Sequence, residues 1–178
     1  MRYPLLTIAL FHCLIVLSIQ VTQQSVIRRE SDRPESNAQK KSAGKRLLIY
    51  SGVSQGYLRI VSRKNISANA KKDDPYAVII TDFRKEGITI MGEKSKLYLC
   101  IHRKNGKMVA MMSPKRDRKK YYCFYKEEMV DLYTTYSPVD KLTWKLLFSR
   151  DGYPRRANNT RVDPKKTIFL KDVISNKR

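Results

Sequence analysis

Histidine and cysteine are scarce in this sequence. Among 178 residues there are two histidines and three cysteines, and outside the first 20 residues only Cys100, His102 and Cys123 remain. Three such ligands fall short of a structural zinc set, which normally uses four. Cys100 and His102 would share a face of a strand, but no third residue is placed to orient the histidine as nucleophilic catalysis requires. No glycine-rich phosphate loop is present either. We therefore predict a protein that is not an enzyme and has no cofactor or metal.

Long hydrophobic runs are also missing, except for one near the N-terminus. Leu5–Leu17 (LLTIALFHCLIVL) follows the positive charge of Arg2. Its length is typical of a secretory signal, whereas a membrane-spanning helix needs roughly 20 residues. The pattern predicts a signal peptide over residues 1–20 and a secreted, extracellular protein, with an uncleaved anchor as the alternative. Residues 21–45 are too polar to offset the entropy cost of ordering them, which predicts a flexible basic arm.

Acidic residues are few in comparison with basic ones. The sequence has 16 Asp and Glu residues and 37 Lys and Arg residues, which gives a formal net charge of +21. Removal of residues 1–20 takes away only Arg2 and leaves +20 (21 − 1). Such an excess favours a polyanionic partner, namely nucleic acid, an anionic membrane or a sulfated polysaccharide. Secretion favours a glycan of the heparan sulfate type over nucleic acid. The alternative is that the charge serves solubility alone.

Helical patterns are rare, and strand patterns dominate from Leu47 onward. The longest helical window, Lys126–Tyr133, is short, whereas alternating apolar residues predict half-buried strands at Leu97–Ile101 and Trp144–Phe148. Glycine and asparagine recur at the predicted turns between strands. The chain is long enough for one domain with one sizeable core.

Three corners of similar sequence follow three of these apolar runs. They are Arg63-Lys64-Asn65, Arg103-Lys104-Asn105 and Arg150-Asp151-Gly152, and they stand 40 and 47 residues apart. Spacings of this size are typical of repeats. Three copies of a four-strand unit predict an all-β protein, a β-trefoil whose closed barrel is capped by hairpins, over residues 46–172, with 173–178 as a tail. A β-sandwich or an open propeller-like array is the alternative.

Five stretches of the chain carry a family resemblance. They are Leu47–Ile60 (LLIYSGVSQGYLRI), Lys96–Met108 (KLYLCIHRKNGKM), Tyr133–Tyr136 (YTTY), Trp144–Arg156 (WKLLFSRDGYPRR) and Ile168–Leu170 (IFL). In this order they resemble a fibroblast growth factor. The resemblance covers roughly Leu47 to Leu170 and implies a β-trefoil that binds heparan sulfate and activates a receptor tyrosine kinase.

Two kinds of covalent modification are predicted. Cys100 and Cys123 form an even pair in an oxidising compartment, which favours one disulfide. The pair is similar to that of a subgroup of secreted fibroblast growth factors. The triplets Asn65-Ile66-Ser67 and Asn158-Asn159-Thr160 are glycosylation sequons in predicted turns, so Asn65 and Asn158 are candidate sites.

The resemblance also implies which residues bind the glycan and the receptor. Sulfate recognition needs Lys and Arg gathered on one surface. In the family the last loop supplies them, and here its basic residues are Arg150, Arg155, Arg156, Arg161, Lys165 and Lys166. Receptor contact needs exposed aromatic and apolar anchors. The matching family positions are Tyr50, Glu127, Tyr133 and Leu170, and the alternative for Leu170 is that it fills the barrel.

The sequence departs from the family pattern at several places. Val53 stands where asparagine is usual, Ala157 where glycine is usual, and Pro164 where a polar residue or glycine is common. The segment from Cys123 to Tyr133 is one residue short, and the loop before Cys123 is lengthened. That loop contains Lys115–Lys120 (KRDRKK), for which three readings stay open: an extended glycan surface, a dibasic cleavage site, or no specific role.

The combined prediction is a secreted growth factor that binds a heparan sulfate proteoglycan and a fibroblast growth factor receptor. It would promote cell growth, migration or differentiation, and would meet the membrane only through the receptor and the glycan. The alternative is a trefoil module that binds glycans or another partner without receptor signalling.

Overall fold

The computed structural model describes residues 44–115, 117–159 and 163–174. Within these ranges the chain forms eleven strands and one short 3-10 helix, η1. The elements are β1 (Lys45–Ser51), β2 (Gly56–Ile60), β3 (Ile66–Ala70), β4 (Ile79–Arg84), β5 (Gly87–Gly92), β6 (Tyr98–His102), β7 (Met108–Met111), β8 (Tyr121–Tyr122), β9 (Tyr125–Val130), β10 (Tyr133–Pro138), η1 (Pro164–Thr167) and β11 (Phe169–Val173). The all-β prediction is confirmed.

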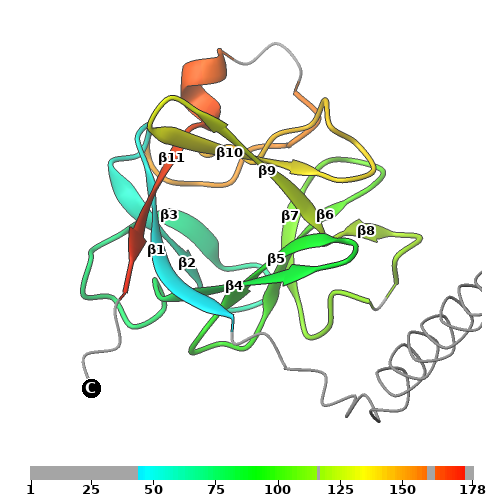
Figure 1. Cartoon of the computed structure of the whole chain (residues 1–178), viewed down its shortest axis with the longest axis horizontal. Helices are drawn as coiled ribbons and strands as arrows, with labels where there is room; N and C mark the ends of the chain where they lie inside the picture. The colour runs from blue at the N-terminus through cyan, green and yellow to red at the C-terminus, as the bar shows by residue number, and fades with distance from the viewer. Residues whose placement is uncertain (1–43, 116, 160–162, 175–178) are drawn as a thin grey trace, which may run out of the picture. The chain divides into compact units, whose positions relative to one another are not determined.

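Six strands close a barrel (Figure 1). Its ring runs from β1 to β11, β10, β9, β5 and β4 and returns to β1, with every neighbouring pair antiparallel. The ladder between β1 and β11, from Leu47 opposite Val173 to Ser51 opposite Phe169, joins the two ends of the domain. A closed ring leaves no exposed sheet edge. The β-trefoil prediction is therefore confirmed in preference to a sandwich or an open array.

The remaining strands form hairpins that extend from the barrel. β2 pairs with β3, and β6 pairs with β7. The third hairpin is irregular, so the prediction of a regular strand over Trp144–Phe148 is wrong. Only an isolated bridge joins Phe148 to Pro154 there. The backbone hydrogen bonds beside this bridge run from the Ser149 N–H to the Tyr153 carbonyl and from the Arg155 N–H to the Leu147 carbonyl, and no regular ladder continues from them.

The barrel interior is filled by aliphatic and aromatic side chains from all three units. Leu99 and Ile101 of β6 are fully buried, and so are Leu146 and Phe148 of the irregular hairpin. Cys100, on the other face of β6, is buried as well, so this strand is more buried than the alternating pattern predicts. Tyr125 begins β9 in the core, and its hydroxyl donates a hydrogen bond to the Leu99 carbonyl. The helical window at Lys126–Tyr133 belongs instead to β9 and the turn into β10.

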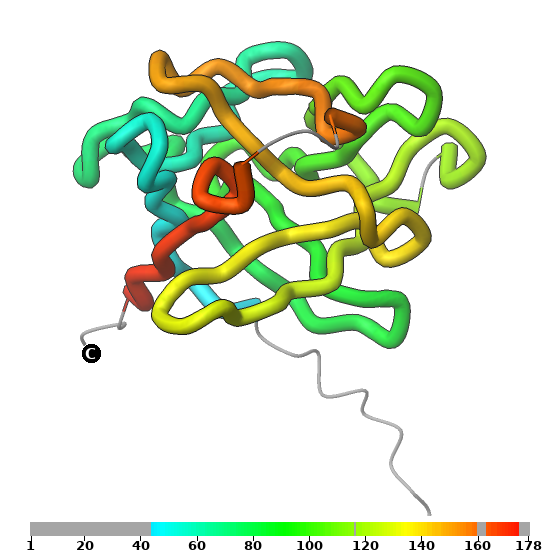
Figure 2. The backbone as a smooth tube through the Cα atoms, turned by 90° about the horizontal axis from the view of Figure 1, so that it is seen from above, coloured from blue at the N-terminus to red at the C-terminus, as the bar shows by residue number. Residues whose placement is uncertain are grey.

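Three hydrogen bonds link the hairpins in a cyclic order. The backbone N–H groups of Ala68, Ala110 and Ala157 donate to the carbonyls of Gly152, Arg63 and Gly106, at 2.8, 3.0 and 2.9 Å respectively. All three alanines are buried. Each unit is thus bonded to the corner of another unit, and the corners gather at one end of the barrel, at the top of Figure 2. We call this end the cap. The turns between β4 and β5 and between β9 and β10 lie at the opposite end.

Candidate functional site

Three of the predicted glycan-binding cations line one groove. Arg150, Arg155 and Lys166 surround a groove of about 480 Å³, together with Val53 from the turn between β1 and β2. All three basic residues are exposed. Two carboxylates, from Asp151 and Asp163, also lie along the lining. The groove therefore joins cations from two segments of the last loop with a residue from the first unit.

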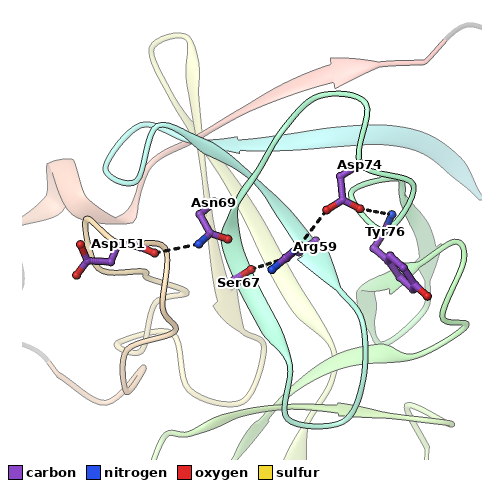
Figure 3. Close-up of polar contacts among 6 residues, drawn as sticks. All are labelled: Arg59, Ser67, Asn69, Asp74, Tyr76 and Asp151. Atoms are coloured by element: carbon purple, nitrogen blue, oxygen red, sulfur yellow. Dashed lines mark hydrogen bonds and ion pairs between the residues drawn. The ribbon is translucent and has the colours of Figure 1, made fainter.

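Strand β3 holds the turn that carries Arg150. The Ala68 N–H donates to the Gly152 carbonyl, and the Asn69 side-chain amide donates to the Asp151 carbonyl at 3.2 Å (Figure 3). Gly152 has a φ of +78°, and a Cβ there would lie 2.6 Å from the Asn69 Cβ. Only glycine fits both the left-handed backbone and this close approach. The turn is thus fixed in position relative to β3.

The turn that carries Val53 rests on the same strand. The Ser54 hydroxyl donates a hydrogen bond to the Ala68 carbonyl. A Cβ at Gly56 would lie 2.6 Å from the Asn69 Cα, so the chain passes too close to β3 for a side chain. Strand β3 therefore supports both turns that border the groove, the one with Val53 and the one with Arg150.

Arg59 lies on β2, the strand paired with β3, and holds β3 in place. Its Nε donates to the Ser67 hydroxyl at 2.9 Å, and its Nη1 pairs with Asp74 at 3.2 Å (Figure 3). Asp74 in turn accepts from the Tyr76 N–H at 2.8 Å. Arg59 is therefore engaged in a structural network, and its charge is not directed to the groove.

Helix η1 positions the last lysines. Asp163 caps it by accepting from the Lys165 N–H at 3.0 Å, and Pro164 occupies its start. Proline suits a first helical position, because no N–H is needed there. This departure from the family pattern thus has a local structural role. Lys166 reaches the groove, whereas Lys165 and Arg156 are exposed but do not line it. Arg161 lies outside the described residues.

Two of the predicted receptor residues face each other. Tyr50 on β1 is directly opposite Leu170 on β11. The Tyr50 ring also packs edge-to-face on Tyr57, with centroids 5.2 Å apart. Leu170 is 37% exposed, while its neighbour Phe169 is 2% exposed and fills the barrel. The alternative that Leu170 is a core residue is therefore wrong.

Glu127 on β9 interacts with side chains of β10 and β11. It accepts a hydrogen bond from the Tyr136 hydroxyl at 3.2 Å and forms an ion pair with Lys171 of β11. Burial, followed by the charge of Glu127, raises the pKa of Tyr136. Glu127 thus joins β9, β10 and β11, and it supports the surface beside Leu170.

The end of β9 and the turn before β10 expose apolar residues that the sequence analysis missed. Met129 is 72% and Leu132 84% exposed, and both flank the predicted residue Tyr133, which is 38% exposed. Tyr133 lies opposite Val130 in the ladder. No sequence signal marked these residues, because apolar side chains near a predicted turn look the same whether they are buried or exposed.

The disulfide between Cys100 and Cys123 is present and buried. Because both sulfurs are bonded, Cys100 is not available as a nucleophile beside His102. The His102 Nδ1 accepts from the Lys104 N–H at 3.2 Å, and its ring packs edge-to-face on Tyr121. Across the described ranges there is no cluster of three groups that could hold a metal ion.

The two candidate glycosylation sites occupy exposed turns. Asn65 is exposed at the corner between β2 and β3, while Ser67 of its sequon is buried in β3. Asn158 is exposed, and its side chain lies against Gly106, where a Cβ would come 2.7 Å from the Asn158 Oδ1. Thr160 of the second sequon lies outside the described residues. Glycosylation at either position stays a prediction.

Two arginines, Arg118 in the lengthened loop before Cys123 and Arg103 in the second corner, lie over aromatic rings. Arg118 pairs with Glu86 at 2.9 Å and lies over the Phe124 ring. Its neighbours Lys115, Lys119 and Lys120 are exposed. Arg103 pairs with Asp140 at 2.8 Å and lies over the Tyr122 ring. Both arginine charges are thus partly compensated within the chain. Arg116 lies outside the described residues, and none of the three readings of this loop is tested.

Comparison with known proteins identifies the family. A model of the fibroblast growth factor family matches residues 45–170. Mouse fibroblast growth factor 8 is 29% identical over 126 residues, which are 69% of this chain and 45% of the mouse protein. Human fibroblast growth factor 18 is 29% identical over 126 residues, or 69% of this chain and 58% of the human protein. The chicken fibroblast growth factor 8 alignment, at 27% identity, covers 88% of this chain and 74% of the relative.

The chain spans about half the length of the mouse and human relatives. In the part of the chain that the structure describes, no helix is long and apolar enough to cross a bilayer. The matched region contains the barrel strands from β1 to the start of β11, the three hairpins, the disulfide and the groove. The protein therefore belongs to the fibroblast growth factor family.

Proposed function

We propose that the protein is a secreted growth factor that binds heparan sulfate through the groove and activates a fibroblast growth factor receptor. Residues 1–20 act as its signal peptide, 21–45 as a flexible arm, 46–172 as the growth factor domain and 173–178 as a tail. It is a signalling ligand and not an enzyme. Growth, migration or differentiation of the receptor-bearing cell is the outcome.

The groove is the observation that carries the glycan part of this proposal. Arg150, Arg155 and Lys166 line it, and none of the nine ion pairs within the described ranges uses any of them. Their charges therefore remain available for sulfates. Arginine adds bidentate geometry to such contacts, and release of counterions makes their sum steeply dependent on salt.

The receptor part rests on exposed anchors on neighbouring strands. Tyr50, Tyr133 and Leu170 lie on β1, β10 and β11, which are consecutive around the barrel. Large exposed side chains of this kind become buried anchors in an interface. A glycan bound to the same molecule would raise the effective concentration of ligand at the receptor.

Chromatography tests the glycan part. The purified domain should elute from heparin at a higher salt concentration than from a plain sulfonate resin of matched charge density. A variant with Arg150→Gln, Arg155→Gln and Lys166→Gln should lose most of this difference. Equal elution of the unaltered domain from both resins would contradict the proposed site.

Receptor phosphorylation in cells, with and without heparin, tests the signalling part. The expected result is phosphorylation that increases with added heparin. Specific heparin binding without phosphorylation would favour the alternative, a trefoil glycan-binding module that does not signal.

A further inference from the structure

The cap carries a cluster of cations that extends beyond the groove. The three corner triplets contain Arg63, Lys64, Arg103, Lys104 and Arg150, against the single carboxylate of Asp151. All five basic residues are exposed except Arg103, which is half-buried and paired with Asp140. The nine ion pairs of the described residues include none of the other four.

The corners are adjacent because backbone hydrogen bonds connect them in a ring. The Arg63 carbonyl accepts from Ala110, and the Gly106 carbonyl accepts from Ala157. Ala110 stands four residues after Gly106 (110 − 106 = 4). At about 3.3 Å per residue, four extended residues span roughly 13 Å. Neighbouring corners are therefore on the order of 13 Å apart, so one extended ligand can contact more than one of them.

The groove and the cap share a residue. Arg150 lines the groove and also begins the third corner. Gly106, in the second corner, is held against the Ala157–Asn158 segment that follows Arg155 and Arg156. A ligand that leaves the groove at this side thus meets the second corner, which carries Lys104. The first corner, which carries Lys64, is bonded in turn to Ala110 of the same hairpin.

We propose that the capped end of the barrel is a second section of the glycan site, on which one sulfated chain continues from the groove across the corners. Lys64 and Lys104 contact sulfate or carboxylate groups beyond those bound by Arg150, Arg155 and Lys166. The ligand that fits is a long, flexible polyanion, because the corner cations are separated and a compact anion would reach only one of them. This inference rests on the proposed function of the groove.

A matched pair of variants tests the inference. The cap variant is Lys64→Gln with Lys104→Gln. The control is Lys45→Gln with Lys85→Gln, which removes the same charge from exposed lysines at the opposite end of the barrel. In the part of the chain that the structure describes, Lys104 and Lys45 form hydrogen bonds only through backbone atoms, and none of the four lysines is in an ion pair. Both variants should therefore fold normally, which circular dichroism and thermal melting can check.

The dissociation constant for long heparin chains would be measured by titration at several NaCl concentrations. We expect the slope of log Kd against log [NaCl] to fall by about two units in the cap variant, one for each lost contact, and to stay near the unaltered value in the control. With a short heparin oligosaccharide that only fills the groove, the cap variant should bind as the unaltered protein does.

Three results would overturn the inference in distinguishable ways. If the cap variant and the control both keep the slope and Kd of the unaltered protein, the cap is not part of the site and the groove proposal stands. If both variants weaken equally, the effect comes from net charge alone. Failure of the unaltered protein to prefer heparin over a sulfonate resin would remove the groove and the cap together.

Discussion

Tyr50 lies directly opposite Leu170 in the ladder between the first and last strands of the barrel. The two residues belong to opposite ends of the domain, and closure of the barrel brings them together. Their neighbours Ile49 and Phe169 are buried, so Tyr50 and Leu170 face outward by strand alternation. A surface that binds a partner here therefore depends on a fully closed barrel.

Replacement of Leu170 by alanine should weaken receptor activation with little effect on folding. An interface anchor typically contributes more than 1 kcal/mol, so we expect the half-maximal concentration for receptor phosphorylation to rise by about tenfold. Val173→Ala is the matched control, because Val173 is an exposed apolar residue of the same strand. Full potency of the Leu170→Ala variant, or an equal loss in the control, would exclude this residue as an anchor.

Replacement of Gly152 by alanine should displace the turn that carries Arg150. The new Cβ would adopt a φ of +78° and lie 2.6 Å from the Asn69 Cβ. We expect a loss of about 1–3 kcal/mol in the free energy of unfolding and earlier elution from heparin. Denaturant titration and heparin chromatography measure the two effects.

Gly52→Ala provides the control for that change. Gly52 lies in the neighbouring turn, and a Cβ added there would meet no atom within 4 Å. Its variant should keep the stability and heparin elution of the unaltered protein. Similar behaviour of the two alanine variants would mean that β3 does not position the loop.

The ion pair between Arg46 and Glu93 should make stability depend on acid pH. Arg46 donates to both carboxylate oxygens, at 2.7 and 2.8 Å, and this hydrogen bonding lowers the pKa of Glu93 from its ordinary value of 4.5. A lowered folded-state pKa gives stability that is fully present above the unfolded value and is lost as the pH falls through the folded value. The melting temperature should therefore decrease below about pH 4.5.

The Glu93→Gln variant isolates this contribution. It should melt at a lower temperature than the unaltered protein at pH 7, and the difference should shrink as the pH falls from 5 to 3. Scanning calorimetry across this range measures both curves. A difference that stays constant with pH would show that the carboxylate charge is not responsible.

The disulfide should stabilise the fold without contributing to the groove. Cys100 and Cys123 are 23 residues apart, and a loop of this size corresponds to about 3 kcal/mol in the chain-entropy model. The double variant Cys100→Ala with Cys123→Ala should unfold at a lower urea concentration and still elute late from heparin at 25 °C. Unchanged urea stability would contradict the first expectation, and lost heparin binding in a folded sample would contradict the second.

Much of the fold was predictable because its signals are local. Alternating side chains at Leu97–Ile101 indicated a strand, the basic corners indicated turns, and the recurrence of those corners indicated a threefold arrangement. The irregular hairpin at Trp144–Phe148 was the exception. Its pattern is that of a strand, but the returning segment forms only an isolated bridge to it, at Pro154. A missing partner on another segment is not visible in the pattern of the strand itself.

The sequence predicted which residue types form the candidate site, but not which individual residues line it. The basic loop was evident from composition, but the sequence does not distinguish Lys166, which lines the groove, from Lys165, which does not. Nor does it reveal that Glu127 is paired with Lys171, or that Met129 and Leu132 are exposed beside Tyr133. These properties depend on residues distant in the chain.

The sequence by itself determined the all-β class, the three repeated units, the excess of positive charge and the pair of cysteines. Each of these follows from composition, from short local patterns or from the recurrence of similar corners 40 and 47 residues apart. Only the tertiary structure decided which cations share a groove, because contacts such as the hydrogen bond from Ala68 to Gly152 form when the barrel closes and brings the first and third units together.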